Sequence, residues 1–145
     1  NKEEIARKKK EYYKKNKEYF YKKSYAYNKK MYNEDDFFRF KINVRSLISG
    51  SFKRSKVNFK KTSKTEEILG CSLADFKLFI SSQFTKGMSF ENHGKWHIDH
   101  IIPISIAKNK DEVIELNHYT NFQPLWAKDN LYKKNKIIEK QLKLI

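Results

Sequence analysis

The sequence predicts an α+β fold that is mainly helical, with a basic helical arm at residues 1–34 and a domain at residues 35–145. Three observations predict this class. The arm contains neither Gly nor Pro. Apolar residues recur at helical spacing between residues 37 and 84, and β-prone segments bounded by Gly or Pro follow residue 94. At 145 residues the chain is long enough for one ordinary domain with an appendage.

The arm carries twelve Lys or Arg against five Glu, a net charge of +7, and seven of the nine tyrosines. A loose echo between residues 10–16 and 17–23 places aromatic residues along one side of a helix. A helix over residues 2–32 would extend for about 45 Å. Polar residues at the positions that a coiled-coil seam requires argue against such a seam. An arm that follows DNA, an arm packed on the domain and a solvated arm all remain open.

The helical half of the domain, residues 35–84, contains several helix signals. A helix is expected to start within residues 33–36 and to end near Gly50, with an apolar face formed by Phe37, Phe40, Val44, Leu47 and Ile48. Gly70 is expected to end a short helix, and Ser72 to cap a helix over residues 73–84. That helix is expected to pack on residues 37–48 through Leu73, Phe76, Phe79, Ile80 and Phe84.

Residues 53–64 hold six basic residues and no acidic one. This composition suits an exposed loop that contacts phosphates, although an ordinary solvated loop explains it too. The single cysteine, Cys71, excludes an internal disulfide and is expected to be buried.

The motif-bearing segment, about residues 94–140, predicts two short strands and a helix. The first strand is expected at 96–102, where Pro103 ends it, and the second at 121–126. The helix is expected over 127–140 with three apolar residues inward: Leu131, Ile137 and Ile138. All four histidines lie between residues 93 and 118, and the two tryptophans, expected in the core, flank the same unit.

The formal net charge of +15 and the pI near 9.7 indicate a polyanionic partner. Nucleic acid is favoured over an anionic membrane because the basic residues are interleaved with aromatic ones. A ribosome-like or merely adhesive basic protein is the alternative. Neither a membrane-spanning stretch nor the apolar run of a signal peptide is found, so we expect a soluble, cytoplasmic protein that does not bind membranes.

The adjacent residues Asp99 and His100, with Asn121 and Asn130 downstream, predict metal-assisted phosphodiester cleavage. An unperturbed histidine, with a pKa of about 6.5, is mostly neutral at pH 7 and can accept a proton. A hard cation such as Mg²⁺ needs few protein oxygen ligands, and Asp99 and Asn130 can supply two. The strand must end or bend for Asp99 and His100 to reach one phosphate. A zinc site formed by the four histidines is the alternative.

The segments GKWHIDHIIP and HYTNFQPLWAKDNLYKK resemble the HNH, or His-Me finger, endonucleases, and most closely those of phages and mobile elements. The resemblance extends upstream and covers residues 40–137, so the arm lies outside it. It implies a ββα-metal motif at the C-terminal end, one Mg²⁺ or Mn²⁺ ion per site, and cleavage of double-stranded DNA by a homing-type nuclease. We expect a monomer.

The resemblance implies a role for each site residue. His100 would be the general base, Asp99 and Asn130 the metal ligands, and Asn121 the brace around His100. Asn130 stands where other members have a histidine, which favours a hard metal over zinc. Lys133 would face the phosphate or leaving group, and His97 would support the site or contact substrate. Further substrate contacts are expected from Lys53, Arg54, Lys56, Lys60, Lys61 and Lys134.

Other interpretations stay open beside these roles. Asn121 can be a simple turn former, His118 a capping or packing residue, and His93 a loop residue. The same fold can also serve as a non-catalytic nucleic-acid-binding module. An RNA-directed or nonspecific nuclease would carry the same motif.

Overall fold

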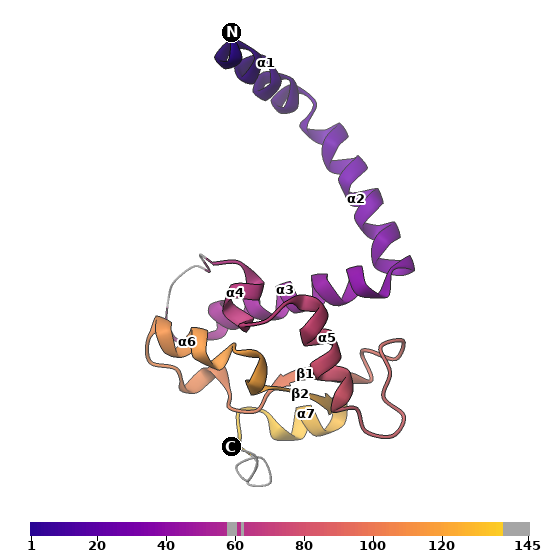
Figure 1. The fold of residues 1–145 in the computed structure, drawn as a ribbon, viewed down its shortest axis with the longest axis vertical. Coiled ribbons are helices and arrows are strands. Elements are labelled where there is room, and N and C mark those ends of the chain that lie inside the picture. The colour runs from indigo at the N-terminus through magenta and orange to yellow at the C-terminus, as the bar shows by residue number, and fades with distance from the viewer. Residues whose placement is uncertain (58–60, 62, 138–145) are drawn as a thin grey trace. The chain divides into compact units, whose positions relative to one another are not determined.

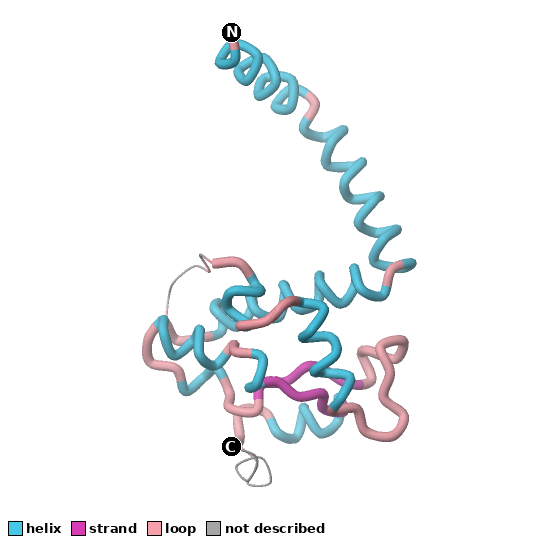
Figure 2. Tube along the Cα trace, viewed as in Figure 1, coloured by secondary structure: helices cyan, strands magenta, loops and turns pink. Residues whose placement is uncertain are grey.

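The computed structural model describes residues 1–57, 61 and 63–137. The fold is mostly helical, with a two-stranded antiparallel sheet in the described residues, and this confirms the α+β class (Figures 1 and 2). The chain divides into two compact units, Asn1–Arg39 and Phe40–Ile145.

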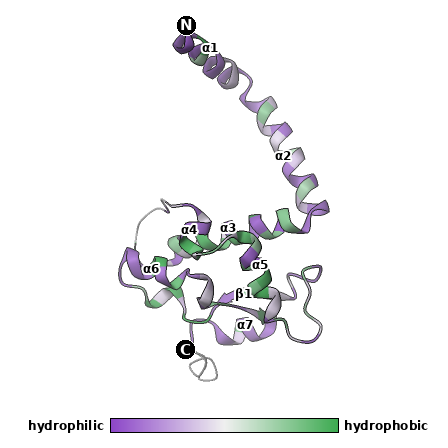
Figure 3. Ribbon diagram, viewed as in Figure 1, coloured by the Kyte–Doolittle hydropathy of each residue, from purple (hydrophilic) through white to green (hydrophobic). Residues whose placement is uncertain are grey.

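The first unit contains α1 (Lys2–Lys15) and α2 (Lys17–Glu34). The helix expected over residues 2–32 is interrupted at Asn16, whose side-chain amide donates a hydrogen bond to the carbonyl oxygen of Tyr12, 2.9 Å away. The Phe20 ring contacts three neighbouring tyrosine rings at the interruption: Tyr12, Tyr13 and Tyr19. Neither helix contains a buried residue, and hydrophilic residues predominate in both, with a few hydrophobic residues between them (Figure 3).

Helix α3 (Asp36–Arg54) provides much of the core of the second unit. Its start is confirmed, because the Asp35 carboxylate accepts a hydrogen bond from the Phe38 amide at 2.8 Å. The expected end near Gly50 is wrong. The helix continues for another turn because Ser51 and Phe52 are buried in the domain, so tertiary packing outweighs the low helix propensity of Gly50.

The next two helices are α4 (Thr65–Leu69) and α5 (Leu73–Ser82). Both predicted caps are confirmed: Gly70 adopts a φ of 76°, and the Ser72 hydroxyl accepts from the Asp75 amide at 3.0 Å. Helix α5 ends two residues earlier than expected. Its Phe76 ring contacts Phe40 of α3, as predicted, and also Phe122 of a strand described below.

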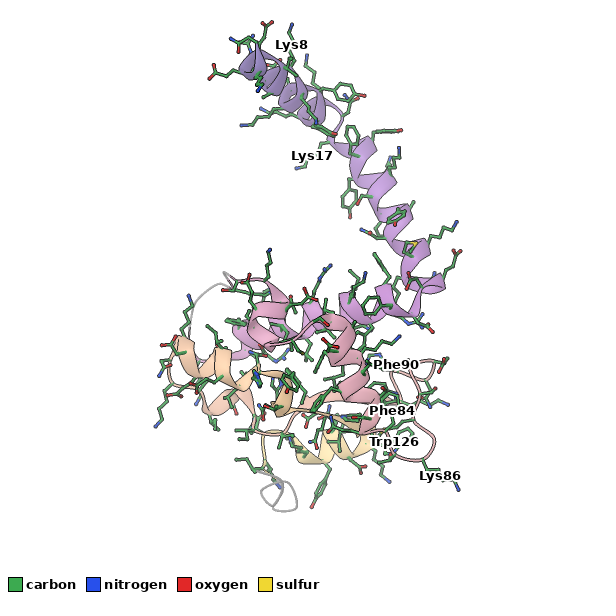
Figure 4. The ribbon with its side chains drawn as sticks, in the orientation of Figure 1. Lys8, Lys17, Phe84, Lys86, Phe90 and Trp126 are labelled. Carbon is green, nitrogen blue, oxygen red and sulfur yellow. The ribbon has the colours of Figure 1, made fainter. Side chains whose placement is uncertain are left out.

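The loop over residues 83–95 packs aromatic rings on Trp96, which is fully buried. The Phe84 and Phe90 rings lie 4.8 and 6.0 Å from the Trp96 ring, measured between centroids. Figure 4 labels Phe84 and Phe90. Trp126 and Cys71, both expected in the core, are only partly buried.

Strands β1 (Trp96–His100) and β2 (Phe122–Trp126) pair antiparallel, with His100 opposite Phe122. Strand β1 therefore stops earlier than predicted, before Pro103. The connection contains the 3₁₀ turn η1 (Ile104–Ile106), helix α6 (Lys110–Leu116) and the 3₁₀ turn η2 (Tyr119–Asn121). Helix α7 (Ala127–Lys133) follows β2 and packs against both strands (Figure 1).

The helix expected over residues 127–140 ends at Lys133, and its predicted inner face is wrong. Leu131 is 73% exposed and Ile137 is 40% exposed, while Ile138 lies outside the described residues. Lys133 is buried instead, and its ammonium group forms an ion pair with Asp99 of β1. The buried side of α7 is therefore the one that carries Lys133, about 200° around the helix axis from the side predicted by Leu131. None of the described helices is both long enough and apolar enough to cross a membrane.

Candidate active site

A pocket of about 430 Å³ brings together three of the residues expected to carry the chemistry. Asp99 and His100 reach it from the end of β1, and Asn130 reaches it from α7. Arg54, from the last turn of α3, lines the same pocket. Consecutive side chains within a strand point to opposite faces. Because β1 ends at His100, the side chains of Asp99 and His100 can both face this pocket.

Asp99 is held through one of its two carboxylate oxygens. Oδ2 accepts a hydrogen bond from Nε2 of Gln123 at 3.0 Å and lies 2.8 Å from Nζ of Lys133. Because both partners use Oδ2, they fix the orientation of the side chain and leave Oδ1 without a described hydrogen bond.

Lys133 is placed differently from its expected position at a phosphate. The side chain is buried, and Nζ lies 2.5 Å from the carbonyl oxygen of His100 as well as beside Asp99. Lys133 does not line the pocket. The negative charge of Asp99 explains this position, since a buried ammonium group needs a paired charge and hydrogen-bond acceptors. Through these two contacts Lys133 holds the Asp99 carboxylate and the end of β1 in position.

His100 is buried, and an asparagine fixes its protonation pattern. Nε2 lies 3.0 Å from Oδ1 of Asn117, while Nδ2 of Asn117 donates to the carbonyl oxygen of Val113 at 2.8 Å. That second bond orients the amide, so its oxygen faces His100 and Nε2 must carry the hydrogen. Nδ1 is then the ring atom that can accept a proton.

Burial lowers the pKa of His100 from 6.5 to about 4. The positive charges of Arg54 and Lys133 act in the same direction, whereas the hydrogen bond to Asn117 and the charge of Asp99 partly oppose it. His100 is therefore neutral at pH 7.

Asn117 was not anticipated as part of the site. It is fully buried, and the Ser51 hydroxyl of α3 lies 3.0 Å from its Oδ1. An asparagine that follows an amphipathic helix normally indicates a helix end. The sequence held no signal that its side chain reaches a histidine seventeen positions earlier, because the contact depends on how the β1–β2 connection folds.

Asn121 links the segment after β1 to the end of α6. Its Oδ1 accepts from the Ile102 amide at 2.9 Å, and its Nδ2 donates to the carbonyl oxygens of Ile102 and Leu116 at 3.0 and 2.8 Å. The side chain thus joins two segments that are far apart in sequence and does more than form a local turn. This geometry fits the brace that the resemblance implies.

Asn130 is oriented by His97. Nδ2 of Asn130 lies 3.1 Å from Nδ1 of His97, and a donated hydrogen bond there leaves the amide oxygen available to a cation. His97 lines an adjoining pocket of about 300 Å³, which shares Leu47, Arg54 and Ile98 with the first. His97 therefore supports an expected metal ligand.

The expected substrate-contacting residues are dispersed. Arg54 and Lys134 line the pocket, whereas Lys53 and Lys56 are exposed and do not line it. Lys61 lines a separate pocket, and Lys60 lies outside the described residues. Lys53 and Arg54 belong to α3 and not to a loop, which corrects the prediction for residues 53–64.

The alternative zinc site is not assembled in the described part of the chain, where no group of three or more His, Cys, Asp or Glu residues could hold a metal. His93 packs on Trp96, and His118 packs on Tyr119 with its Nδ1 2.8 Å from the Thr120 hydroxyl. Asp99 and Asn130 instead offer oxygen donors, which suit a hard divalent cation that keeps several water ligands.

Comparison with known proteins finds viral relatives. The chain is similar to two proteins of Acanthamoeba polyphaga mimivirus, both described only as uncharacterized. It is 33% identical to protein L426 over 115 residues, which cover 77% of this chain and 49% of that protein. It is 28% identical to protein L246 over 125 residues, which cover 77% of this chain and 53% of that protein.

The chain thus spans about half the length of the curated relatives it matches. No family model matches the chain, and no solved structure does.

Proposed function

We propose that the chain is a metal-dependent HNH endonuclease that hydrolyses phosphodiester bonds in double-stranded DNA. The observation that carries the proposal is the pocket in which Asp99, His100 and Asn130 meet. β1, β2 and α7 would form the ββα-metal motif around it. The net charge of +15 supports a nucleic-acid substrate. A homing-type role rests on the sequence resemblance.

His100 would act as the general base through Nδ1. Asn117 holds Nε2–H in place, so Nδ1 is the atom that can take a proton from the attacking water. The low pKa keeps the ring neutral and ready to accept, although it also makes the ring a weak base. A bound phosphodiester adds negative charge beside the ring, which favours the imidazolium and strengthens the base.

Asp99 Oδ1 and the Asn130 amide oxygen would hold one Mg²⁺ or Mn²⁺ ion. When bound, the ion supplies Lewis-acid polarisation of the phosphate and neutralises developing charge. Gln123 and Lys133 fix the orientation of the Asp99 carboxylate, and the contact of the Asn130 amide nitrogen with His97 would leave the amide oxygen available to the ion. Arg54 places a further positive charge at the pocket, where it can bind a phosphate oxygen.

A supercoiled-plasmid assay tests the proposal. The chain is expected to nick or linearise plasmid with Mg²⁺ and to lose this activity with EDTA. His100→Ala should abolish cleavage and keep DNA affinity, measured by fluorescence anisotropy. His118→Ala is a matched control, because His118 lies outside the pocket. If wild-type protein binds DNA but never cleaves DNA or RNA, the chain is a non-catalytic nucleic-acid-binding module.

A further inference from the structure

A second pocket, of about 450 Å³, lies on another face of α3. Arg45 and Ser49 of α3 line it, together with Lys61, the segment 64–66 and Leu73. None of these residues lines the pocket that contains Asp99 and His100. The two pockets are therefore separate sites.

Helix geometry places the two pockets on opposite sides of α3. At about 100° per residue, Ser49 lies roughly 40° from Arg45 around the helix axis. Leu47 and Arg54, which line the first pocket, lie about 180–200° from Arg45. A phosphate group bound in the second pocket would thus be a different group from a phosphate bound in the pocket of His100.

The lining of the second pocket is strongly cationic. Three side chains, those of Arg45, Lys61 and Lys64, are positive, and only Glu66 is negative. One oxygen of Glu66 already accepts a hydrogen bond from the Leu73 amide at 2.8 Å. Among residues 1–57, 61 and 63–137, no ion pair involves any of the three cations. The pocket therefore has more positive charge than the protein balances.

Lys61 is held at this pocket by a neutral partner. Its Nζ lies 2.7 Å from the Thr65 hydroxyl, which cannot neutralise an ammonium charge. Burial lowers the pKa of Lys61, and the positive charge of Arg45 lowers it further. Two cations thus face one pocket and repel each other, and an oxyanion between them would relieve that repulsion.

We propose that this pocket binds a phosphate group, and that its source is the nucleic-acid backbone at a position away from the scissile bond. Arg45 offers a guanidinium fork, the lysines offer point charges and Thr65 offers a hydroxyl, which are the groups that commonly contact phosphate oxygens. The choice of nucleic acid as the source rests on the proposed nuclease function. The phosphate site itself does not.

The test uses the full chain with Arg45→Gln and Lys64→Gln combined, in a His100→Ala background so that cleavage does not disturb binding. The control removes the same number of charges at two exposed lysines, with Lys86→Gln and Lys108→Gln (Figure 4 labels Lys86). Arg45 and Lys64 are exposed, so both double variants should fold, and thermal unfolding would verify this. Duplex affinity is measured by anisotropy at several salt concentrations, and inorganic phosphate is titrated by NMR.

The pocket variant should bind DNA more weakly, with a log–log salt slope that is smaller by about 1 for each phosphate that the protein no longer neutralises. Its NMR response to phosphate should disappear, while the control keeps both properties. Unchanged phosphate titration and an unchanged salt slope would overturn the phosphate site. Loss of the phosphate response with DNA binding equal to the control would overturn nucleic acid as the source and assign the pocket to a free phosphate compound. Failure of the nuclease proposal would appear separately, as absent cleavage by wild-type protein.

Discussion

The buried His100 ring should make the domain sensitive to acid. Its pKa is about 4 in the folded protein, against 6.5 for an unperturbed histidine. As pH falls below 6.5, His100 therefore binds a proton in the unfolded chain, whereas His100 in the folded chain stays neutral until the pH approaches 4. The contribution of this group to stability is complete above pH 6.5 and is lost as pH falls toward 4.

The size of this effect follows from the same pKa values. One proton is worth about 1.36 kcal/mol per pH unit, so the folded domain should lose about 3 kcal/mol of unfolding free energy from His100 between pH 6.5 and 4. His100→Gln keeps a hydrogen-bond donor but cannot titrate, and it should lack this component of the pH dependence.

The assay is urea unfolding of wild-type and His100→Gln proteins at a series of pH values in EDTA, followed by tryptophan fluorescence, to which the buried Trp96 contributes. Carboxylates titrate in both proteins, so the difference between their curves isolates His100. If the two proteins lose stability in parallel between pH 6.5 and 4, the inferred burial of a neutral His100 is incorrect.

Three further substitutions give distinct readouts. Asn117→Leu should lower kcat with little change in DNA affinity, and ¹⁵N NMR should show that the Nε2–H tautomer of His100 is no longer dominant; a persistent tautomer would contradict the role of Asn117. Lys133→Met should reduce unfolding free energy by about 3–5 kcal/mol, because Asp99 loses its buried cation, and a stability equal to wild type would refute this pairing. Gly70→Ala should destabilise the domain by about 1–3 kcal/mol, since Gly70 has a φ of 76° and an added Cβ would lie 2.6 Å from Nε2 of His118; adding His118→Ala should restore part of the loss.

The helix boundaries that the sequence predicted correctly depend on local chemistry. Asp35, Gly70 and Ser72 act through hydrogen bonds or backbone angles within a few residues of themselves. The boundary near Gly50 failed because Ser51 and Phe52 are buried in the domain, where the Ser51 hydroxyl lies 3.0 Å from Oδ1 of the distant Asn117. Local propensity carries no information about that packing.

The buried side of α7 shows a second limit of prediction from sequence, that of apolar periodicity. Apolar spacing predicted Leu131 inward, yet Lys133 is the buried residue. Periodicity assigns polar residues to solvent by default. It cannot identify a lysine whose charge is neutralised by a carboxylate on a strand more than thirty positions earlier.

The residues of the candidate site also divide into those that the sequence predicts and those that only tertiary contacts reveal. Asp99, His100 and Asn130 were proposed from residue chemistry and resemblance, and the fold gathers them at one pocket. Asn117 and Gln123, which orient His100 and Asp99, were missed because their hydrogen bonds join distant segments. Groups that react carry a signal in sequence, while the groups that orient them depend on tertiary contacts.

Run-off mapping of both strands of a linear duplex, incubated with Mg²⁺ and either wild-type or His100→Ala protein, tests the central proposal most directly. We expect wild-type protein to produce discrete ends with 5′-phosphate and 3′-hydroxyl groups, and His100→Ala to bind the same DNA without producing them. Equal cleavage by both proteins would contradict a mechanism in which His100 activates water at the Asp99–Asn130 pocket.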